Sequence, residues 1–258
     1  MTDMERLALI LIIYAAHAEA QILTGSGPIS GYDFMEPTTQ QLQDDDFINP
    51  AFFLVDRGLA LWDQTSPTNS KSCGICHQNV ETDMYDVSRQ YPKYDTKLSK
   101  FINLEMKINS EIVKKLDAAA LASGSEDLLA LTSLIGLQSR GLPMSSASNF
   151  GTQAWIERGK TIYETKRGQL NLSCANCHQD HWGDRLRGDT ISQGQINAFP
   201  IFRLIWGEVG SLQRMFSWCM NAVRSEPYDN DSDEYLALEA FLTKRGQGLA
   251  IETPGVRR

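Results

Sequence analysis

The 258-residue sequence predicts a mostly α-helical protein built as a tandem pair of similar units. Three observations lead to this fold class. A CxxCH motif occurs twice with matching flanks, apolar residues recur at helical spacing around each copy, and no stretch alternates between apolar and polar residues as a half-buried strand does. A chain of this length can form two cores of ordinary size.

The duplication is seen when the first motif, residues 73–77, is placed over the second, residues 174–178. Both halves then read R-G-x-x-[LI]-[WY], nine residues, and S-C-x-x-C-H-Q. Two chance motifs would not share their flanks, so the chain is a tandem repeat. The matching flanking pairs are Arg57 with Arg158, Gly58 with Gly159, Trp62 with Tyr163, Ser72 with Ser173, and Gln78 with Gln179.

Each unit is expected to hold one helix before its cysteines and another at its end. The segment 52–62 carries apolar residues at steps of three and four, and 125–138 and 231–245 do the same. The last of these has Ser232 as its N-cap and Gly246 as its end.

The N-terminal residues indicate export. An apolar run of ten residues, 7–16, is too short to span a bilayer and is followed by two A-x-A patterns within 16–20. These features are typical of a secretory signal peptide, so we predict that residues 1–20 are removed and that the mature protein is periplasmic, without a membrane span. The formal net charge of −8 argues against nucleic-acid binding, which needs a basic face.

The rest of the chain is expected to divide near the stretch 141–151, which is rich in small residues. We assign residues 21–145 to an N-terminal domain and residues 146–258 to a C-terminal domain that holds the active site.

Three kinds of site use a CxxC pair: structural zinc, dithiol redox and haem attachment. A zinc finger needs a second ligand pair downstream, and a thioredoxin-like site needs an alternating βα pattern; neither is visible in either half. Haem attachment uses all three residues of the motif, because the two thiols form thioethers and the adjacent histidine binds the iron. We therefore predict two cytochrome c-like domains and two covalent haem c groups, held by Cys73, Cys76, Cys174 and Cys177, with His77 and His178 as iron ligands.

The fifth cysteine, Cys219, is left over. Free cysteine is often plain core, but an iron needs a second ligand and the second unit has few soft donors near this position. The other candidates are Met215 and Met220. Two arginines, Arg214 and Arg224, are close in sequence and would favour a thiolate, although they could equally lie on a solvated face or bind haem propionates.

The second half then shows a specific resemblance. The run "RGQLNLSCANCHQDHWGDRLRGDTISQGQINAFPIFRLIWGEVGSLQRMFSWCM" and the segment that follows it resemble the SoxA family of periplasmic sulfur-oxidising cytochromes. The first half is similar more thinly, through its CxxCH, "YPKYD" and "LEMKIN". The resemblance implies a SoxX-type monohaem partner and the oxidative conjugation of thiosulfate to the carrier cysteine of SoxYZ. Electrons would pass through haem to a downstream cytochrome c.

The resemblance also implies site residues. His178 is the proximal ligand of the active-site haem, and Cys219 is the distal ligand, commonly as a cysteine persulfide. Arg214 and Arg203, the latter in "FPIFRLIW", are the candidates for holding the sulfonate oxygens.

Two positions depart from the family pattern. An arginine pair usually precedes the ligand cysteine, whereas here the pair reads Arg214-Met215. The first haem lacks a cysteine after the stretch 107–111, which leaves Met84 and Met106 as soft donors. We expect the first iron to be five-coordinate or methionine-bound, and not thiolate-bound.

Three functions compete at this point. The first is a SoxA-like L-cysteine S-thiosulfotransferase, favoured by Cys219 and the intact second motif. The second is a non-catalytic dihaem electron carrier, favoured by Met215 and the missing ligand of the first haem. The third is a thiosulfate dehydrogenase that forms tetrathionate.

Overall fold

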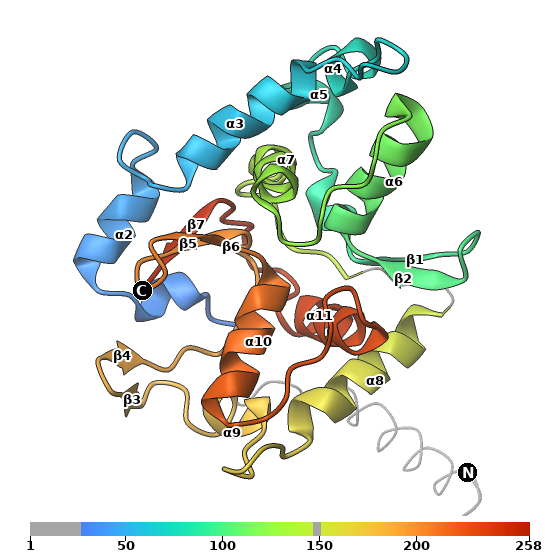
Figure 1. Cartoon of the computed structure of the whole chain (residues 1–258). Helices are drawn as coiled ribbons and strands as arrows, with labels where there is room; N and C mark the ends of the chain where they lie inside the picture. The colour runs from blue at the N-terminus through green and yellow to red at the C-terminus, as the bar shows by residue number, and fades with distance from the viewer. Residues whose placement is uncertain (1–26, 147–150) are drawn as a thin grey trace, which may run out of the picture.

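The computed structural model describes residues 27–146 and 151–258, so the expected signal peptide lies outside the described residues. It is rich in helix, as predicted (Figure 1). The longer helices are α2 (Pro37–Asp44), α3 (Phe52–Asp63), α6 (Leu104–Leu116), α7 (Glu126–Leu137), α8 (Thr152–Glu164), α10 (Leu212–Ala222) and α11 (Asp233–Arg245). Single turns are η1 (Gly31–Phe34), α4 (Cys73–Cys76), α5 (Val80–Asp83), η2 (Ser88–Gln90) and α9 (Cys174–His178).

Each repeat is built on one crossed pair of helices. Helix α3 packs on α7 in the first unit, and α8 packs on α11 in the second. The repeated glycines lie at these crossings: a Cβ on Gly58 would come within 2.4 Å of the Ala130 carbonyl oxygen, and one on Gly159 within 1.9 Å of that of Ala237. Both repeats therefore need glycine here because another side chain would push the helices apart.

The repeated arginines also have equivalent contacts. Arg57 Nε donates to Asp127 at 2.6 Å, and Arg158 Nη2 donates to Glu234 at 2.6 Å. In each unit the arginine reaches an acid in the first turn of the partner helix. These exposed pairs contribute about 1 kcal/mol or less each, so they orient the helices more than they stabilise them.

The helix caps follow the sequence closely. Ser125 caps α7 through the Leu128 amide, and Ser232 caps α11 through the Tyr235 amide. Gly246 ends α11, as predicted.

The sequence shows no alternating strand pattern, but the structure contains several short strands. Strands β5, β6 and β7 form a three-stranded sheet in the order β6-β5-β7, in which β5 and β7 run parallel. Each strand is three residues long or shorter, too short to show an alternating pattern. The strands are β1 (Lys93–Asp95), β2 (Lys100–Ile102), β3 (Arg185–Leu186), β4 (Asp189–Thr190), β5 (Ile201–Arg203), β6 (Glu208–Gly210) and β7 (Gly255–Arg257).

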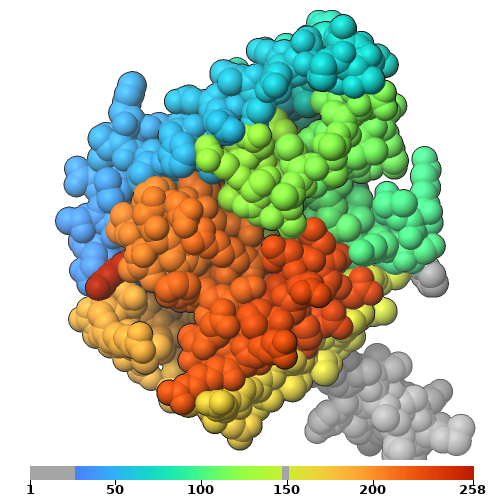
Figure 2. All heavy atoms as spheres, in the orientation of Figure 1, coloured from blue at the N-terminus to red at the C-terminus, as the bar shows by residue number. Residues whose placement is uncertain are grey.

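The N-terminal segment 27–51 packs on the second unit. The side-chain oxygen of Gln43 accepts from the Val256 amide at 3.0 Å, and Asn49 donates to the Pro254 carbonyl at 3.1 Å. The space-filling view shows this segment, in blue, against the orange and red atoms of the second half (Figure 2). The division of the chain at 145/146 stays a prediction. Segment 27–51, which precedes the helices of the first unit, is held by contacts with the second unit. Within residues 27–146 and 151–258, no helix combines the length and apolar character that crossing a membrane requires.

Candidate active site at the second CxxCH motif

Helix α9 presents the second motif in a fixed turn. The Ser173 hydroxyl accepts from the Asn176 amide at 3.3 Å, and the Asn176 side chain accepts from the Ser173 amide at 3.1 Å. This reciprocal cap starts the helix at Cys174 and brings Cys174 and Cys177 onto one face, both half-buried. The equivalent Ser72 caps α4 by accepting from the Ile75 amide, without the reciprocal bond, and this shared capping role explains the repeated serine.

The ring of His178 is oriented by a hydrogen bond at Nδ1, which leaves Nε2 available to bind a metal. Its Nδ1 lies 2.8 Å from the Ser192 carbonyl oxygen and donates to it in the tautomer that leaves Nε2 free. Gly194 lies against the ring, where a Cβ would come within 2.8 Å of His178 Cγ. Burial lowers the pKa of His178, which favours the neutral imidazole that an iron ligand must be.

Cys219 faces the same pocket from helix α10. Burial, and then the nearby Cys174, raise the pKa of the Cys219 thiol to about 12, while Arg203 opposes the shift. Cys174 and Cys177 both raise the pKa of Cys219, which indicates that the three sulfurs lie near one another. An iron at this position would supply the positive charge that converts such a thiol to a thiolate.

The two methionines considered beside Cys219 have other partners. The Met220 sulfur lies in the core, 3.8 Å from the Tyr235 hydroxyl, and the Met215 sulfur accepts from Arg203 Nη1 at 3.1 Å. Of the three sulfur donors on α10, Cys219 is the one that faces the cysteine pair.

The candidate arginines differ in their surroundings. Arg203 at the end of β5 is half-buried, and its guanidinium lies between Trp206 and Trp218, with ring-centroid distances of 5.3 and 5.6 Å. Arg214 is more exposed; it stacks on Trp206 at 4.2 Å and bonds Glu208 at 2.6 Å. Arg224 is exposed and donates to Gln169 at 3.4 Å.

The residues present fit a haem c. Beyond the two thiols and His178, the pocket contains buried donors without a partner among the described residues, namely Tyr163 Oη and Arg245 Nε. Both belong to groups next to the motif: Cys174 and Cys177 influence Tyr163, and Arg245 Nη2 donates to the His178 carbonyl at 2.9 Å. Such donors match the carboxylates of haem propionates.

The first motif is more open. Cys73 is half-buried, whereas Cys76 and His77 are exposed. The His77 ring lies 5.8 Å from Trp62, and no residue of the described chain hydrogen-bonds to it. Met84 is 7% exposed and belongs to the core cluster against which Cys73 packs, while Met106 is half-buried. Met84 is therefore better placed than Met106 to serve this site.

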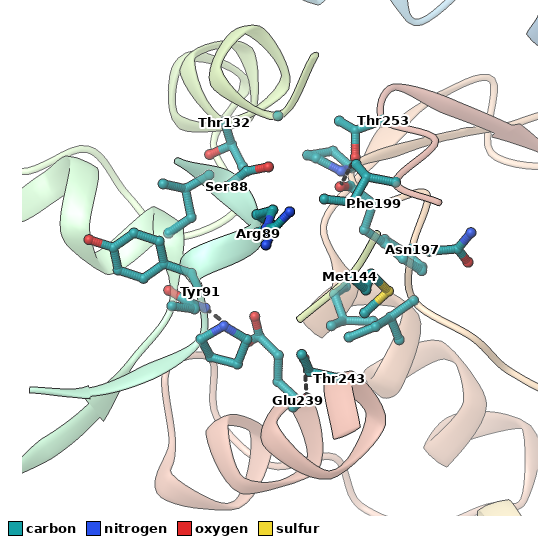
Figure 3. A pocket seen from close by; sticks show the side chains of 18 of the residues that line it. Ser88, Arg89, Tyr91, Thr132, Met144, Asn197, Phe199, Glu239, Thr243 and Thr253 are labelled. Carbon is teal, nitrogen blue, oxygen red and sulfur yellow. Dashed lines mark hydrogen bonds between the residues drawn. The ribbon is translucent and has the colours of Figure 1, made fainter. Parts of the chain in front are cut away.

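A cavity of about 120 Å³, lined by both polar and apolar groups, lies between the two units (Figure 3). Helix α11 contributes Glu239 to its wall and α6 contributes Glu105, while Ser88 and Asn197 each have a buried oxygen without a partner among the described residues. Burial raises the pKa of Glu239 to about 8 and that of Glu105 to about 7. The negative charges of Glu105 and Asp231 raise the pKa of Glu239 further. At neutral pH Glu239 is therefore mostly protonated, and Glu105 is close to half protonated.

Sequence reasoning missed several of these residues. Glu239 had a signal, because it lies four positions after Tyr235 on the apolar face of the predicted helix. Trp206 and the Ser192 carbonyl had none, since neither a backbone acceptor nor a ring that contacts arginines through a turn leaves a recognisable sequence pattern.

Comparisons with known proteins agree with this geometry. The family model described as "SoxA/TsdA, cytochrome c domain" matches residues 57–144 and 158–251. The L-cysteine S-thiosulfotransferase subunit SoxA of Pseudaminobacter salicylatoxidans is 40% identical over 231 residues, 89% of this chain and 81% of the relative. The SoxA subunit of Paracoccus pantotrophus is 37% identical over 228 residues, 88% of this chain and 78% of the relative.

A solved structure supports the same assignment. A chain of SoxXA from P. pantotrophus matches with a TM-score of 0.86 and 37% identity, covering 90% of this chain and 87% of that one. The fold is thus a tandem pair of cytochrome c-like domains, and the cytochrome c domain carries covalently bound haem c. The chain belongs to the SoxA family of cytochromes c.

Proposed function

We propose that the protein is the haem-bearing catalytic subunit of an L-cysteine S-thiosulfotransferase, which joins thiosulfate to the carrier cysteine of SoxYZ. The observation that carries this proposal is the half-buried Cys219 thiol, which lies near Cys174 and Cys177 and beside a half-buried arginine. An electron-transfer cytochrome has no need for a cation at its sulfur ligand. An enzyme acting on an anionic thiosulfate does.

The overall reaction is an oxidation. Thiosulfate and a carrier thiol form one S–S bond and release one proton and two electrons, giving a thiol-bound thiosulfonate. When bound, the haem provides an iron that takes up electrons one at a time. The second electron must therefore pass on, and a SoxX-type monohaem cytochrome and a downstream cytochrome c are the proposed acceptors.

The chain's own residues position the substrate sulfur. Cys219, as a thiolate or a persulfide, and His178 would hold the haem iron, and thiosulfate would arrive beside the Cys219 sulfur. Arg203 holds the sulfonate oxygens in a pocket that screens charge poorly. Arg214, paired with Glu208 and stacked on Trp206, supports the outer wall of that pocket.

The remaining assignments follow from the same reading. Two haems are bound, one at each motif, and the first iron is five-coordinate or held by a methionine, with Met84 preferred. Residues 1–20 are the signal peptide, and the mature protein works in the periplasm in complex with a SoxX-type subunit. A solved SoxXA structure that matches over 90% of this chain supports that partner.

The decisive experiment combines mass spectrometry with an assay. We expect two haem masses and an extra sulfur on the Cys219 peptide, and we expect turnover with thiosulfate and SoxYZ that Cys219→Met abolishes while both haems stay attached. Turnover with thiosulfate alone, yielding tetrathionate, would instead identify a thiosulfate dehydrogenase. An unmodified Cys219 with no turnover in either assay would identify an electron carrier.

A further inference from the structure

Two buried N–H donors near Cys219 have no hydrogen-bond partner among the described residues. Arg203 Nε and Trp206 Nε1 are both shielded from solvent, and neither makes a hydrogen bond within the described part of the chain. Each such donor costs about 1–3 kcal/mol when it is left unsatisfied. Two of them in one cluster indicate a ligand that accepts hydrogen bonds.

The Arg203 guanidinium is held in place, but no carboxylate pairs with it directly: Asp189 influences it from beyond salt-bridge distance and is itself paired with Arg258. It contacts the rings of Trp206 and Trp218, which meet edge to face with their centroids 5.7 Å apart. Its Nη1 donates to the Met215 sulfur at 3.1 Å, a weak acceptor that carries no charge. No carboxylate of the described residues forms a salt bridge with it.

Arg214 is different in this respect. Its Nη2 lies 2.6 Å from Glu208, and its side chain is 41% exposed, so its charge is already compensated and partly screened by water. An anion that enters the pocket therefore gains more from Arg203 than from Arg214. The charge of Arg203 also acts on the neighbouring thiol: it lowers the pKa of Cys219, whereas burial raises it.

We propose that Arg203 Nε and Trp206 Nε1 bind the sulfonate oxygens of the substrate, so that this donor pair selects sulfonate-bearing thioanions over sulfide. The proposal rests on the proposed function and adds Trp206 as a specificity-determining residue. Sulfide has no oxygen to accept these bonds and would leave both donors buried and unsatisfied. A site built in this way rejects the analogue that lacks the acceptor.

The test is Trp206→Phe in the haem-loaded protein in complex with its SoxX-type partner. Phenylalanine keeps a ring against Arg203 and Arg214 and deletes the N–H. We expect the KM for thiosulfate to rise about tenfold, with a much smaller change in kcat, because one hydrogen bond to a charged group is lost. Competitive inhibition by sulfite should weaken by a similar factor.

The matched control is Trp155→Phe. Trp155 stacks on Phe101 with ring centroids 5.4 Å apart, away from Arg203, and its N–H is not one of the unpartnered buried donors. Its KM should change by less than twofold. Equal KM values for both variants and the wild type would refute the donor pair.

A second readout separates this proposal from a role in haem binding and from the proposed function itself. Equilibrium dialysis of thiosulfate against the oxidised protein, without the carrier, should show about tenfold weaker binding to Trp206→Phe than to wild type. If the wild type binds thiosulfate but does not turn it over with SoxYZ, the proposed function fails while the binding comparison still decides the donor pair. A shifted resting visible spectrum with unchanged thiosulfate affinity would show that the N–H serves a haem propionate, and the proposal would fall.

Discussion

The side-chain amide of Asn103 donates a hydrogen bond to Glu239 at 3.2 Å across the boundary between the two units. Glu239 lies on α11 of the second unit, and Glu105, two residues after Asn103, reaches the same cavity from α6 of the first. Asp231 adds a further negative charge, while Arg89 in the cavity wall is paired with Asp86. Protonation of Glu239 is therefore part of how the two units stay packed.

This relationship predicts that stability falls as the pH rises. The pKa of Glu239 is about 8 in the folded protein against an ordinary value of 4.5, so the folded state binds more protons than the unfolded state between these values. The free energy of unfolding should decrease across pH 5–8, by up to about 1.4 kcal/mol per pH unit from this group. Chemical denaturation at several pH values should show the slope in the wild type and a shallower one in Glu239→Gln. Glu226→Gln removes an exposed carboxyl and is the control; equal slopes in all three proteins would contradict the assignment.

The crossing of α8 and α11 predicts a large cost for one methyl group. A Cβ at position 159 meets the backbone of Ala237 at 1.9 Å, and backbone cannot rotate away. Gly159→Ala should lower the free energy of unfolding by about 3 kcal/mol, measured by denaturant titration. Gly27→Ala, where nothing lies within 4 Å, should change it by less than about 0.5 kcal/mol. Wild-type stability of Gly159→Ala would show that the helices have room to separate.

The His178 ring depends on Gly194. An alanine there would press a methyl group within 2.9 Å of Nδ1 and disturb the bond to the Ser192 carbonyl. We expect Gly194→Ala to change the electron paramagnetic resonance signal of the second iron. Gly183→Ala is matched in backbone conformation, with φ of 89° against 68°, but has nothing within 4 Å. The two variants should therefore share any backbone strain and differ in the iron signal, and identical spectra would remove Gly194 from the site.

The contrast between the two motifs predicts one thiolate-ligated iron and not two. Cysteine occurs at positions 73, 76, 174, 177 and 219, so the first unit has no thiol beyond its own motif. The oxidised protein should show a single low-spin thiolate signal, which Cys219→Ser abolishes. Met84→Leu keeps the core volume, should cost less than about 1.5 kcal/mol, and should alter the other iron's spectrum if that methionine is the ligand. A second thiolate signal would overturn this picture.

Much of the fold could be predicted because its determinants are local. The duplication, the three helices, the Ser232 and Gly246 caps of the last helix and the two CxxCH turns follow from residues within a few positions of one another. The sheet could not be predicted, since β5 and β7 are more than fifty residues apart in sequence and only three residues long.

The site divides in the same way. The five cysteines and two histidines follow from motif and count, whereas the pairing of Arg203 with Trp206 and Trp218 depends on how a β-turn meets α10. The salt bridge between Arg214 and Glu208 could not be predicted from the sequence, because the turn between β6 and α10 brings the two residues together.

The contact of segment 27–51 with the last strand has a practical consequence for dissecting the molecule. A fragment that ends at residue 145 would keep Gln43 and Asn49 but lose Val256 and Pro254, their hydrogen-bond partners. The reciprocal fragment would uncover Val256, which is fully buried in the intact chain. Fragments made by cutting at the repeat boundary would thus expose apolar surface and tend to aggregate. A single-haem fragment of the second half that keeps the native fold would need residues 27–51 added as a separate peptide.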